Sequence, residues 1–297
     1  MHKSFLQLRR ALEQRPPVRV SVACAQDEEM IQTVKAAYFL GFAEAILVGD
    51  RNRIREIMEK KEFSAPLDII HEPDEFKAAL IASSIVRDKG ADVLMKGLIN
   101  TTLFLKAVLD EKSGLRNDRL LSHFSAFENQ EHSRIMYYTD GGLNTFPNLQ
   151  EKVQILKNGL EALHHIGIDT PKVAALAANE VVNPKMQSTL DARELERMAL
   201  AGELPRCILE GPITIDVAFS KEAAKRKGIE SKISGEVDLL LMPNIEAGNM
   251  VGKTLMFFAH AKMAGVVLGA QSPVVLASRA ANAEEKLNSL ALACLMS

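Results

Sequence analysis

Short apolar runs alternate with longer helical patterns along most of this chain, and this alternation restricts its fold more than any other feature. The β-branched run Arg19–Ala25 precedes a helical pattern over Glu28–Leu40, and the run Ala45–Val48 precedes another over Arg53–Lys60. The same rhythm returns in the second half, which ends in a helical pattern over Ala283–Met296. Strands that alternate with helices of this length form β-α-β units and a mostly parallel sheet. The sequence therefore predicts an α/β fold.

The rhythm changes between Leu120 and Thr139. Two strand-like runs stand there with only a short polar stretch between them, which predicts an antiparallel hairpin. The turn-like segment Asp140–Pro147 follows and is the best candidate for a crossing between domains. The chain has 297 residues, about twice the ~150 residues of a typical domain. We therefore expect two α/β lobes, with ligands beyond the carboxyl ends of the parallel strands.

The charge balance and the cysteines exclude several classes of protein. The 36 Lys and Arg residues against 38 Asp and Glu give a net charge of −2, which argues against nucleic acid and membrane surfaces as partners. No apolar run approaches the ~18 residues of a membrane span, and the charged stretch Met1–Arg15 predicts an amphipathic helix rather than a signal peptide. Three well-separated cysteines favour a reducing compartment and form no metal-ligand spacing. We expect a cytoplasmic protein without a metal site.

The first segment suited to chemistry follows a predicted strand that ends near Met95. Lys96 and Gly97 come next, and Thr101 and Thr102 then open an apolar helix. Free N–H groups at a helix start attract anions, and the lysine adds a positive charge. An ordinary capped helix with a surface lysine would give the same pattern.

A second segment, Ala247–Thr254, has the spacing A-x-x-x-x-G-K-T between a strand and a helix, close to a nucleotide-binding P-loop. Its first position is Ala247 instead of glycine, and the adjacent Glu246 would repel phosphates. P-loops also usually follow an early strand. We therefore favour a polar helix start that lines a different site.

The third segment lies between the last predicted strand and the last helix. The strand Val274–Ala277 ends in Ser278 and Arg279, and Glu284 and Glu285 follow in the first turn of the helix. An arginine at the tip of a parallel strand beside a helix start suits phosphate recognition. The helix dipole alone also favours carboxylates in that turn.

Taken in order, six segments of the chain resemble the phosphate butyryltransferase branch of the phosphate acyltransferases. The resemblance runs from about Arg19 to the last helix. Its most specific parts are the Lys96 segment, the Glu246–Asn249 run and the Ser278-Arg279 pair. The six segments are MKGLINTTLFLKAVL, GLRNDRLLSH, ILEGPITIDVAFS, DLLLMPNIEAGN, GKTLMFFAHAKMAGVVLGAQSPVVLASRA and EEKLNSLALA.

That resemblance implies two α/β domains with a cleft between them, in the isocitrate/isopropylmalate dehydrogenase-like architecture. The implied first domain is discontinuous and comprises residues 1–145 and 276–297, and it is completed by the last helix. The implied second domain comprises residues 146–275. Members of the family form homodimers or larger homo-oligomers.

The implied reaction is acyl-CoA + phosphate ⇌ acyl phosphate + CoA, with small-molecule substrates, coenzyme A as a substrate and no cofactor. We expect butyryl or branched short chains. A thiol with a pKa near ~8.5 is only a few per cent thiolate at neutral pH, so a carboxylate that takes its proton would help. In the family that carboxylate follows the Ser-Arg pair. By spacing, Glu285 is the first candidate for this base and Glu284 the second.

The other implied roles concern charge and position. Arg279 would stabilise the thiolate and the phosphate charge, with Ser278 hydrogen-bonding nearby. Backbone N–H groups near Gly97 or Thr101 could stabilise the oxyanion. The residues implied to hold substrate are Lys96, Gly97, Thr101, Thr102 and, on the opposite wall, Asn249.

The sequence departs from the family pattern at two carboxylates. Relatives commonly have aspartate where this chain has Asn244 and Ala281. These changes would tune the acyl preference or mark a weak or silent enzyme. Two alternatives therefore stay open, namely a non-catalytic acyl-CoA or acyl-phosphate sensor on the same fold and a P-loop-type nucleotide-binding protein.

Overall fold

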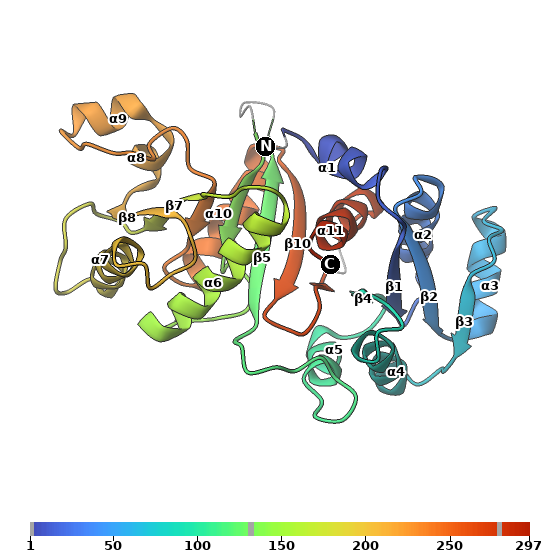
Figure 1. Ribbon diagram of the computed structural model, residues 1–297. Coiled ribbons are helices and arrows are strands. Elements are labelled where there is room, and N and C mark those ends of the chain that lie inside the picture. The colour runs from blue at the N-terminus through green and yellow to red at the C-terminus, as the bar shows by residue number, and fades with distance from the viewer. Residues whose placement is uncertain (1–2, 130–133, 278–280) are drawn as a thin grey trace. The chain divides into compact units, whose positions relative to one another are not determined.

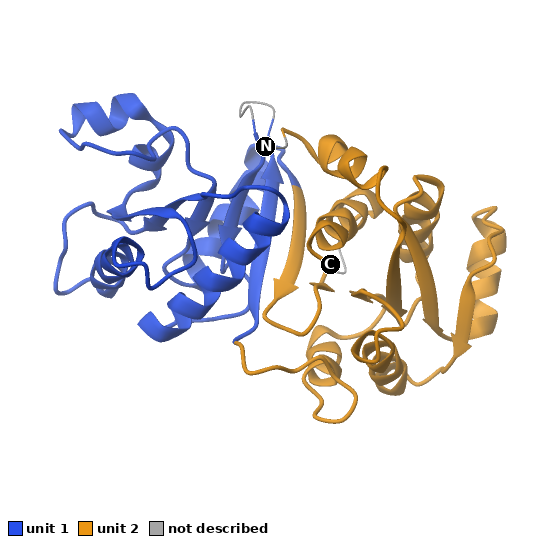
Figure 2. Ribbon diagram, viewed as in Figure 1, with its two compact units in different colours: residues 1, 120–262 blue, residues 2–119, 263–297 orange. Residues whose placement is uncertain are grey.

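The computed structural model describes residues 3–129, 134–277 and 281–297 (Figure 1). The described chain forms two compact units, coloured separately in Figure 2. Unit 1 comprises residues 120–262, and unit 2 comprises the described residues of 2–119 with 263–297. Each unit has its own helices and strands, and β-α-β units occur in both. The predicted α/β fold class is confirmed.

Unit 2 is built on a mostly parallel sheet with the strand order β3-β2-β1-β4-β11-β10. All neighbouring strands are parallel except β10 and β11. The strands are β1 Val18–Ala23, β2 Ala43–Gly49, β3 Asp68–His71, β4 Val93–Lys96, β10 Lys262–Leu268 and β11 Val274–Val275. The helices are α1 Phe5–Leu12, α2 Glu28–Phe39, α3 Arg51–Lys60, α4 Glu75–Arg87, α5 Thr101–Val108 and α11 Ala283–Met296.

Helix α11 is buried on every side within unit 2. It contacts α1, α2, β4 and β11, and each residue from Lys286 to Met296 is buried. Its buried residues are mostly apolar but include Lys286, Asn288 and Ser289, and a helix without an exposed face belongs in an interior. The core of unit 2 is therefore incomplete without this last helix.

Unit 1 contains the predicted hairpin. Its strand order is β5-β6-β9-β7-β8, with β5 antiparallel to β6 and the other neighbours parallel. The strands are β5 Ser122–Glu128, β6 Met136–Thr139, β7 Lys172–Leu176, β8 Ile208–Ile213 and β9 Leu239–Leu241. The helices are α6 Leu149–His165, α7 Gln187–Leu200, α8 Ile215–Phe219, α9 Lys221–Arg226 and α10 Ile245–Phe258.

The boundaries between the compact units differ from the domain boundaries that we expected. The chain passes from unit 2 to unit 1 at Arg119 and returns after Lys262, whereas the predicted limits follow residues 145 and 275. The hairpin lies in unit 1 because β6 pairs with β9 from Tyr137 to Thr139. The predicted domain limits stay a prediction.

Within the described ranges, no helix is both long enough and apolar enough to cross a membrane.

Candidate functional site

The order of strands in unit 2 contains a switch point between β1 and β4. The chain lays β2 and β3 on one side of β1 and then crosses to the other side to form β4. In sheets of this kind, ligands bind beyond the carboxyl ends of the two strands at such a point. Ala23 pairs with Lys96 at the ends of these strands. The predicted substrate residues Lys96 and Gly97 therefore stand at the switch point.

Gly97 is packed too closely against β1 to carry a side chain. Its N–H donates to the carbonyl of Ala23 at 2.8 Å, and the next N–H, of Leu98, donates to the carbonyl of Cys24 at 2.9 Å. A Cβ atom on Gly97 would lie 2.3 Å from the Cys24 oxygen and 2.6 Å from the Ala23 oxygen. The N–H of Gly97 is thus already bonded within the fold, and a role for backbone N–H groups near Gly97 or Thr101 in stabilising an oxyanion stays a prediction.

Lys96 brings a positive charge to this edge. Its side chain is buried, with 3% of the residue exposed, and Nζ donates to the carbonyl of Gly97 at 3.2 Å. A cation buried at a strand end beside a tight backbone turn suits the recognition of an anionic ligand. The alternative of a surface lysine beside an ordinary helix is wrong, because Lys96 is not on the surface.

Cys24 is a feature of the switch point that sequence reasoning missed. Its backbone has a φ of 54°, in the left-handed region that non-glycine residues seldom adopt. Its Sγ donates to the carbonyl of Glu75 at 3.3 Å. Burial and the nearby charge of Glu75 raise the pKa of the Cys24 thiol to about 12, although the charge of Lys96 opposes both. The thiol is therefore neutral at physiological pH, and no sequence signal other than its place after a strand would have revealed it.

The start of α5 is capped as predicted. The side chain of Asn100 accepts from the N–H of Thr102 at 2.8 Å, and both Thr101 and Thr102 are exposed. Because the first turn of a helix leaves N–H groups without helical partners, this end attracts negative charge. Thr101, Thr102, Lys96 and Gly97 thus belong to one local segment.

The start of α11 carries the two candidate bases. The side chain of Asn282 accepts from the N–H of Glu285 at 2.9 Å and so caps the helix. Glu284 is exposed, whereas Glu285 is half-buried. Ser278 and Arg279 lie outside the described residues.

A buried cation fastens this helix start to α2. Nζ of Lys286 lies 3.3 Å from Oδ2 of Asp27, the N-cap of α2, and Thr33 donates from Oγ1 to the carbonyl of Ala283 at 3.3 Å. Sequence reasoning missed Lys286 and Asp27. A signal existed, because a lysine in the first turn of a helix opposes the dipole and needs a carboxylate nearby.

Helix α10 overturns the P-loop alternative. The whole segment Ala247–Thr254 lies inside α10, so it forms no loop that could cradle phosphates. Asn244 caps this helix by accepting from the N–H of Ala247 at 2.9 Å. Since asparagine and aspartate cap helices equally well, an asparagine at this position keeps the local structure. Asn249 is exposed on α10 and belongs to unit 1, whereas the other described candidates belong to unit 2.

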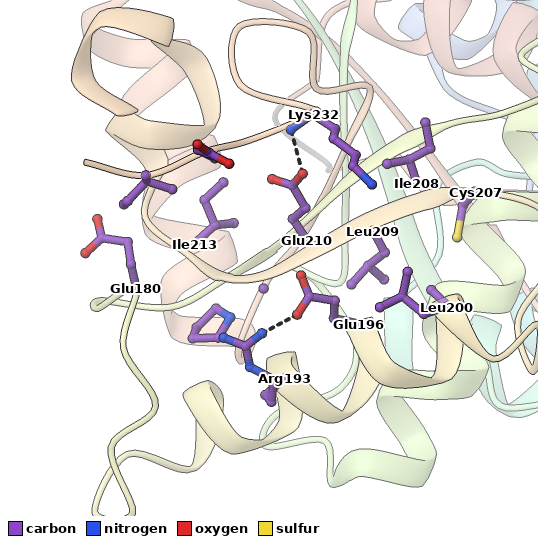
Figure 3. A pocket seen from close by; sticks show the side chains of 15 residues that line it. Glu180, Arg193, Glu196, Leu200, Cys207, Ile208, Leu209, Glu210, Ile213 and Lys232 are labelled. Carbon is purple, nitrogen blue, oxygen red and sulfur yellow. Dashed lines mark hydrogen bonds and ion pairs between the residues drawn. The ribbon is translucent and has the colours of Figure 1, made fainter. Parts of the chain in front are cut away.

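A cavity of about 480 Å³ lies in unit 1 beside β8 (Figure 3). Two of its carboxylates have partners within the cavity lining or next to it. Glu196 pairs with Arg193, and Glu210 accepts from the N–H of Lys232 at 2.7 Å and from Oγ of Ser231 at 2.6 Å. None of the predicted site residues lines it. Across the described residues, no group of three or more His, Cys, Asp or Glu side chains could hold a metal ion.

Comparison with known proteins gives a consistent result over the full chain. Residues 59–294 match the family described as phosphate acetyl/butaryl transferase. The chain is similar to the phosphate butyryltransferase of Clostridium acetobutylicum, with 43% identity over 297 residues, 100% of this chain and 99% of that protein.

Solved structures agree with this result. A branched-chain phosphotransacylase from Enterococcus faecalis V583 has a TM-score of 0.81 and 31% identity, and the match covers 94% of this chain and 98% of that one. A 4-hydroxythreonine-4-phosphate dehydrogenase from Klebsiella pneumoniae has a TM-score of 0.62 at 12% identity, with coverages of 94% and 99%. The second likeness concerns the fold alone and agrees with the expected dehydrogenase-like architecture.

Proposed function

Because this chain belongs to the phosphate acetyl/butaryl transferase family, we propose that it transfers a short acyl group between coenzyme A and phosphate. In the direction of acyl phosphate synthesis, a phosphate oxygen attacks the thioester carbonyl and the C–S bond breaks. The CoA thiolate leaves and takes up a proton. The observation that carries this proposal is the buried Lys96 beside Gly97 at the switch point, which offers a positive charge to a phosphate group.

The acyl group is butyryl or a branched short chain. The Clostridium relative is named for butyryl transfer, and the Enterococcus structure is named for branched-chain substrates. Lys96, Gly97, Thr101, Thr102 and Asn249 hold the substrates in this proposal. Arg279 stabilises the thiolate and the phosphate charge, and Ser278 hydrogen-bonds beside it.

The first test is CoA release from butyryl-CoA, followed with a thiol reagent in the presence and absence of phosphate. We expect release that depends on phosphate. If CoA binds but no thiol appears with butyryl-, isobutyryl- or acetyl-CoA, the protein is a sensor on the same fold. The cap formed by Asn244 favours the enzyme, since it shows that one of the two lost aspartates is replaced without damage to the helix start.

Glu285 is the base that takes the thiol proton in the reverse direction, and its replacement tests this role. We expect Glu285→Gln to slow CoA acylation by butyryl phosphate roughly 100- to 10,000-fold, most strongly near neutral pH, where little free thiolate exists. Glu284→Gln is the matched control in the same helical turn and should keep most of the activity. If Glu284→Gln is the damaging change, the base stands one position earlier.

We also propose a homo-oligomer formed through α10. Gly248 and Gly252 face β6, since a Cβ atom on Gly252 would lie 2.3 Å from the Tyr138 hydroxyl and one on Gly248 2.6 Å from the Cα of Gly141. The large apolar side chains therefore point outward. Met250 is 67% exposed, Phe257 71% and Phe258 84%. Exposed apolar clusters of this kind mark protein–protein interfaces.

Light scattering on the purified protein tests this interface. We expect the wild-type mass to be at least twice that of one chain, and Phe257→Glu to shift it toward the monomer because it places a charge in the apolar contact. Phe39→Glu in α2 of unit 2, where the side chain is 67% exposed, is the control and should leave the mass unchanged. A monomeric wild-type protein would contradict the proposal.

A cytoplasmic location fits this function. The described cysteines Cys24, Cys207 and Cys294 are free thiols, as expected in a reducing compartment.

A further inference from the structure

A histidine lies at the edge of unit 1 where ligands are expected. The parallel strands β6 and β9 end at Thr139 and Leu241, and the antiparallel strand β5 begins at this same edge with Ser122 and His123. Ligands of α/β sheets bind beyond the carboxyl ends of parallel strands. The half-buried His123 is thus placed at the ligand side of this sheet, on a regular strand rather than on a loop.

The imidazole of His123 is held from one side by a hydroxyl relay. Its Nδ1 lies 3.1 Å from Oγ of Ser125, which is fully buried. Ser125 pairs with Tyr138 across the hairpin, and the two hydroxyls hydrogen-bond. The Tyr138 hydroxyl is confined in turn by α10, where Gly252 leaves no room for a Cβ atom. The ring nitrogen Nδ1 is therefore occupied by its hydrogen bond with Ser125.

A buried carboxylate holds the backbone of His123 and the loop that follows β6. Asp140 is 2% exposed and accepts four N–H bonds, from the backbones of His123, Gly142 and Leu143 and from Nδ2 of Asn144, at 2.6–3.1 Å. This loop lies against the ring, because a Cβ atom on Gly142 would be 3.0 Å from Cγ of His123.

The same loop also meets the start of α10. The N–H of Ile245 donates to the carbonyl of Thr145 at 3.1 Å, and Gly141 packs on Gly248, next to the predicted substrate residue Asn249. His123 and the start of α10 thus flank one rigid loop.

The surroundings decide which ring nitrogen is left for a ligand. Burial lowers the pKa of His123 and the charge of Asp140 opposes this effect, so the ring is neutral at physiological pH. Burial raises the pKa of Tyr138 to about 12, so its phenol keeps its proton. In the arrangement that we propose below, the phenol donates to Ser125, Ser125 donates to Nδ1, and the imidazole proton resides on Nε2. Within the described chain, no side chain or backbone group is hydrogen-bonded to Nε2.

We propose that His123 is a substrate-binding residue whose Nε2–H donates a hydrogen bond to an oxygen of the acyl phosphate, with Ser125, Tyr138 and Asp140 as positioning residues. The inference rests on the proposed function and adds a neutral donor to the cationic groups already named. A fixed donor of this kind stabilises oxygen charge as it develops in the transition state.

Two replacements of His123 distinguish the roles of its two ring nitrogens. His123→Asn keeps a polar group near the place of Nδ1 and loses Nε2, and we expect kcat/KM with butyryl phosphate to fall roughly 100-fold. His123→Gln keeps a donor near Nε2 and should retain more activity than His123→Asn. His165→Asn, on the exposed end of α6, is the control and should match the wild type. Equal kcat/KM for His123→Asn and the wild type would overturn the inference.

A nitrogen NMR measurement gives a readout independent of turnover. In protein labelled at histidine nitrogen, we expect His123 to show the Nε2–H tautomer and its Nε2 signal to shift when butyryl phosphate is added. Ser125→Ala should change the tautomer balance while the fold, checked by urea unfolding, is kept. The inference is contradicted if the wild type shows the Nδ1–H tautomer. It is also contradicted if the chemical shift of Nε2 does not change when butyryl phosphate is added. If the wild-type protein releases no CoA, the proposed function fails, and this titration alone decides about His123.

Discussion

Gly97→Ala is expected to reduce phosphate-dependent CoA release roughly 100-fold, because displacing a substrate-holding segment by about 1 Å can cost that much. The added Cβ atom would meet two backbone oxygens, of Ala23 and Cys24, at 2.6 and 2.3 Å. Neither oxygen can rotate away, since both accept N–H bonds that join β1 to the residues after β4. The segment that carries Lys96 must therefore shift. We also expect the free energy of unfolding to fall by roughly 2–4 kcal/mol.

The control for this prediction is Gly159→Ala in the middle of α6. There the new Cβ atom would meet side-chain atoms, 3.2 Å from Leu239 Cδ2, 3.4 Å from Thr139 Cγ2 and 3.7 Å from Phe124 Cδ2, and alanine favours helix by about 1 kcal/mol over glycine. Urea unfolding and the CoA-release assay on both variants make the comparison. Wild-type values for both measurements in Gly97→Ala would show that β1 and β4 do not approach each other as described.

The second large effect concerns a buried ion pair between α6 and α7. Nζ of Lys152 lies 2.6 Å from Oδ2 of Asp191, the two side chains are only 6% and 5% exposed, and Gln187 donates to the other carboxylate oxygen. Lys152→Met leaves the charge of Asp191 buried without its cation. We expect the free energy of unfolding to fall by about 3–5 kcal/mol, as measured in urea.

A second substitution separates the charge effect from packing. In Lys152→Met/Asp191→Leu, no buried charge is left, so most of the lost stability should return. Lys221→Met removes a cation whose pair with Glu236 is exposed, and it should change stability little. If the free energy of unfolding of the double variant is as low as that of the single variant, the pair stabilises the protein through side-chain packing rather than through charge.

Much of the fold follows from periodicity, and the departures have local causes. The last helix begins and ends where its apolar spacing predicts, from Ala283 to Met296. Strand β8 runs from Ile208 to Ile213 and includes Gly211 and Pro212, residues that are more typical of turns. Proline is tolerated on a strand at the edge of a sheet, and β8 is such a strand. An edge position cannot be read from the sequence.

Some residues of the candidate site could be predicted from the sequence and others could not. Lys96, Gly97 and the start of α5 follow from one continuous stretch of sequence, so local pattern and the family resemblance suffice to find them. Lys286 and Asp27, which are 259 residues apart in the chain, meet only because α11 packs against α2. His123 and Asp140 are brought together by the register of the β5–β6 hairpin. Contacts of this kind depend on tertiary packing, and a single sequence does not reveal it.

The discontinuity of unit 2 has a consequence for how the protein is made. A ribosome delivers the first part of unit 2, then all of unit 1, and only afterwards β10, β11 and α11. Unit 1 can fold while it emerges, because its residues are contiguous. The exposed apolar side of the unfinished first part must wait for α11 throughout that time, which makes the nascent chain a client for chaperones. Stop codons or pauses shortly before residue 283 are therefore expected to yield a folded unit 1 attached to an aggregation-prone remainder.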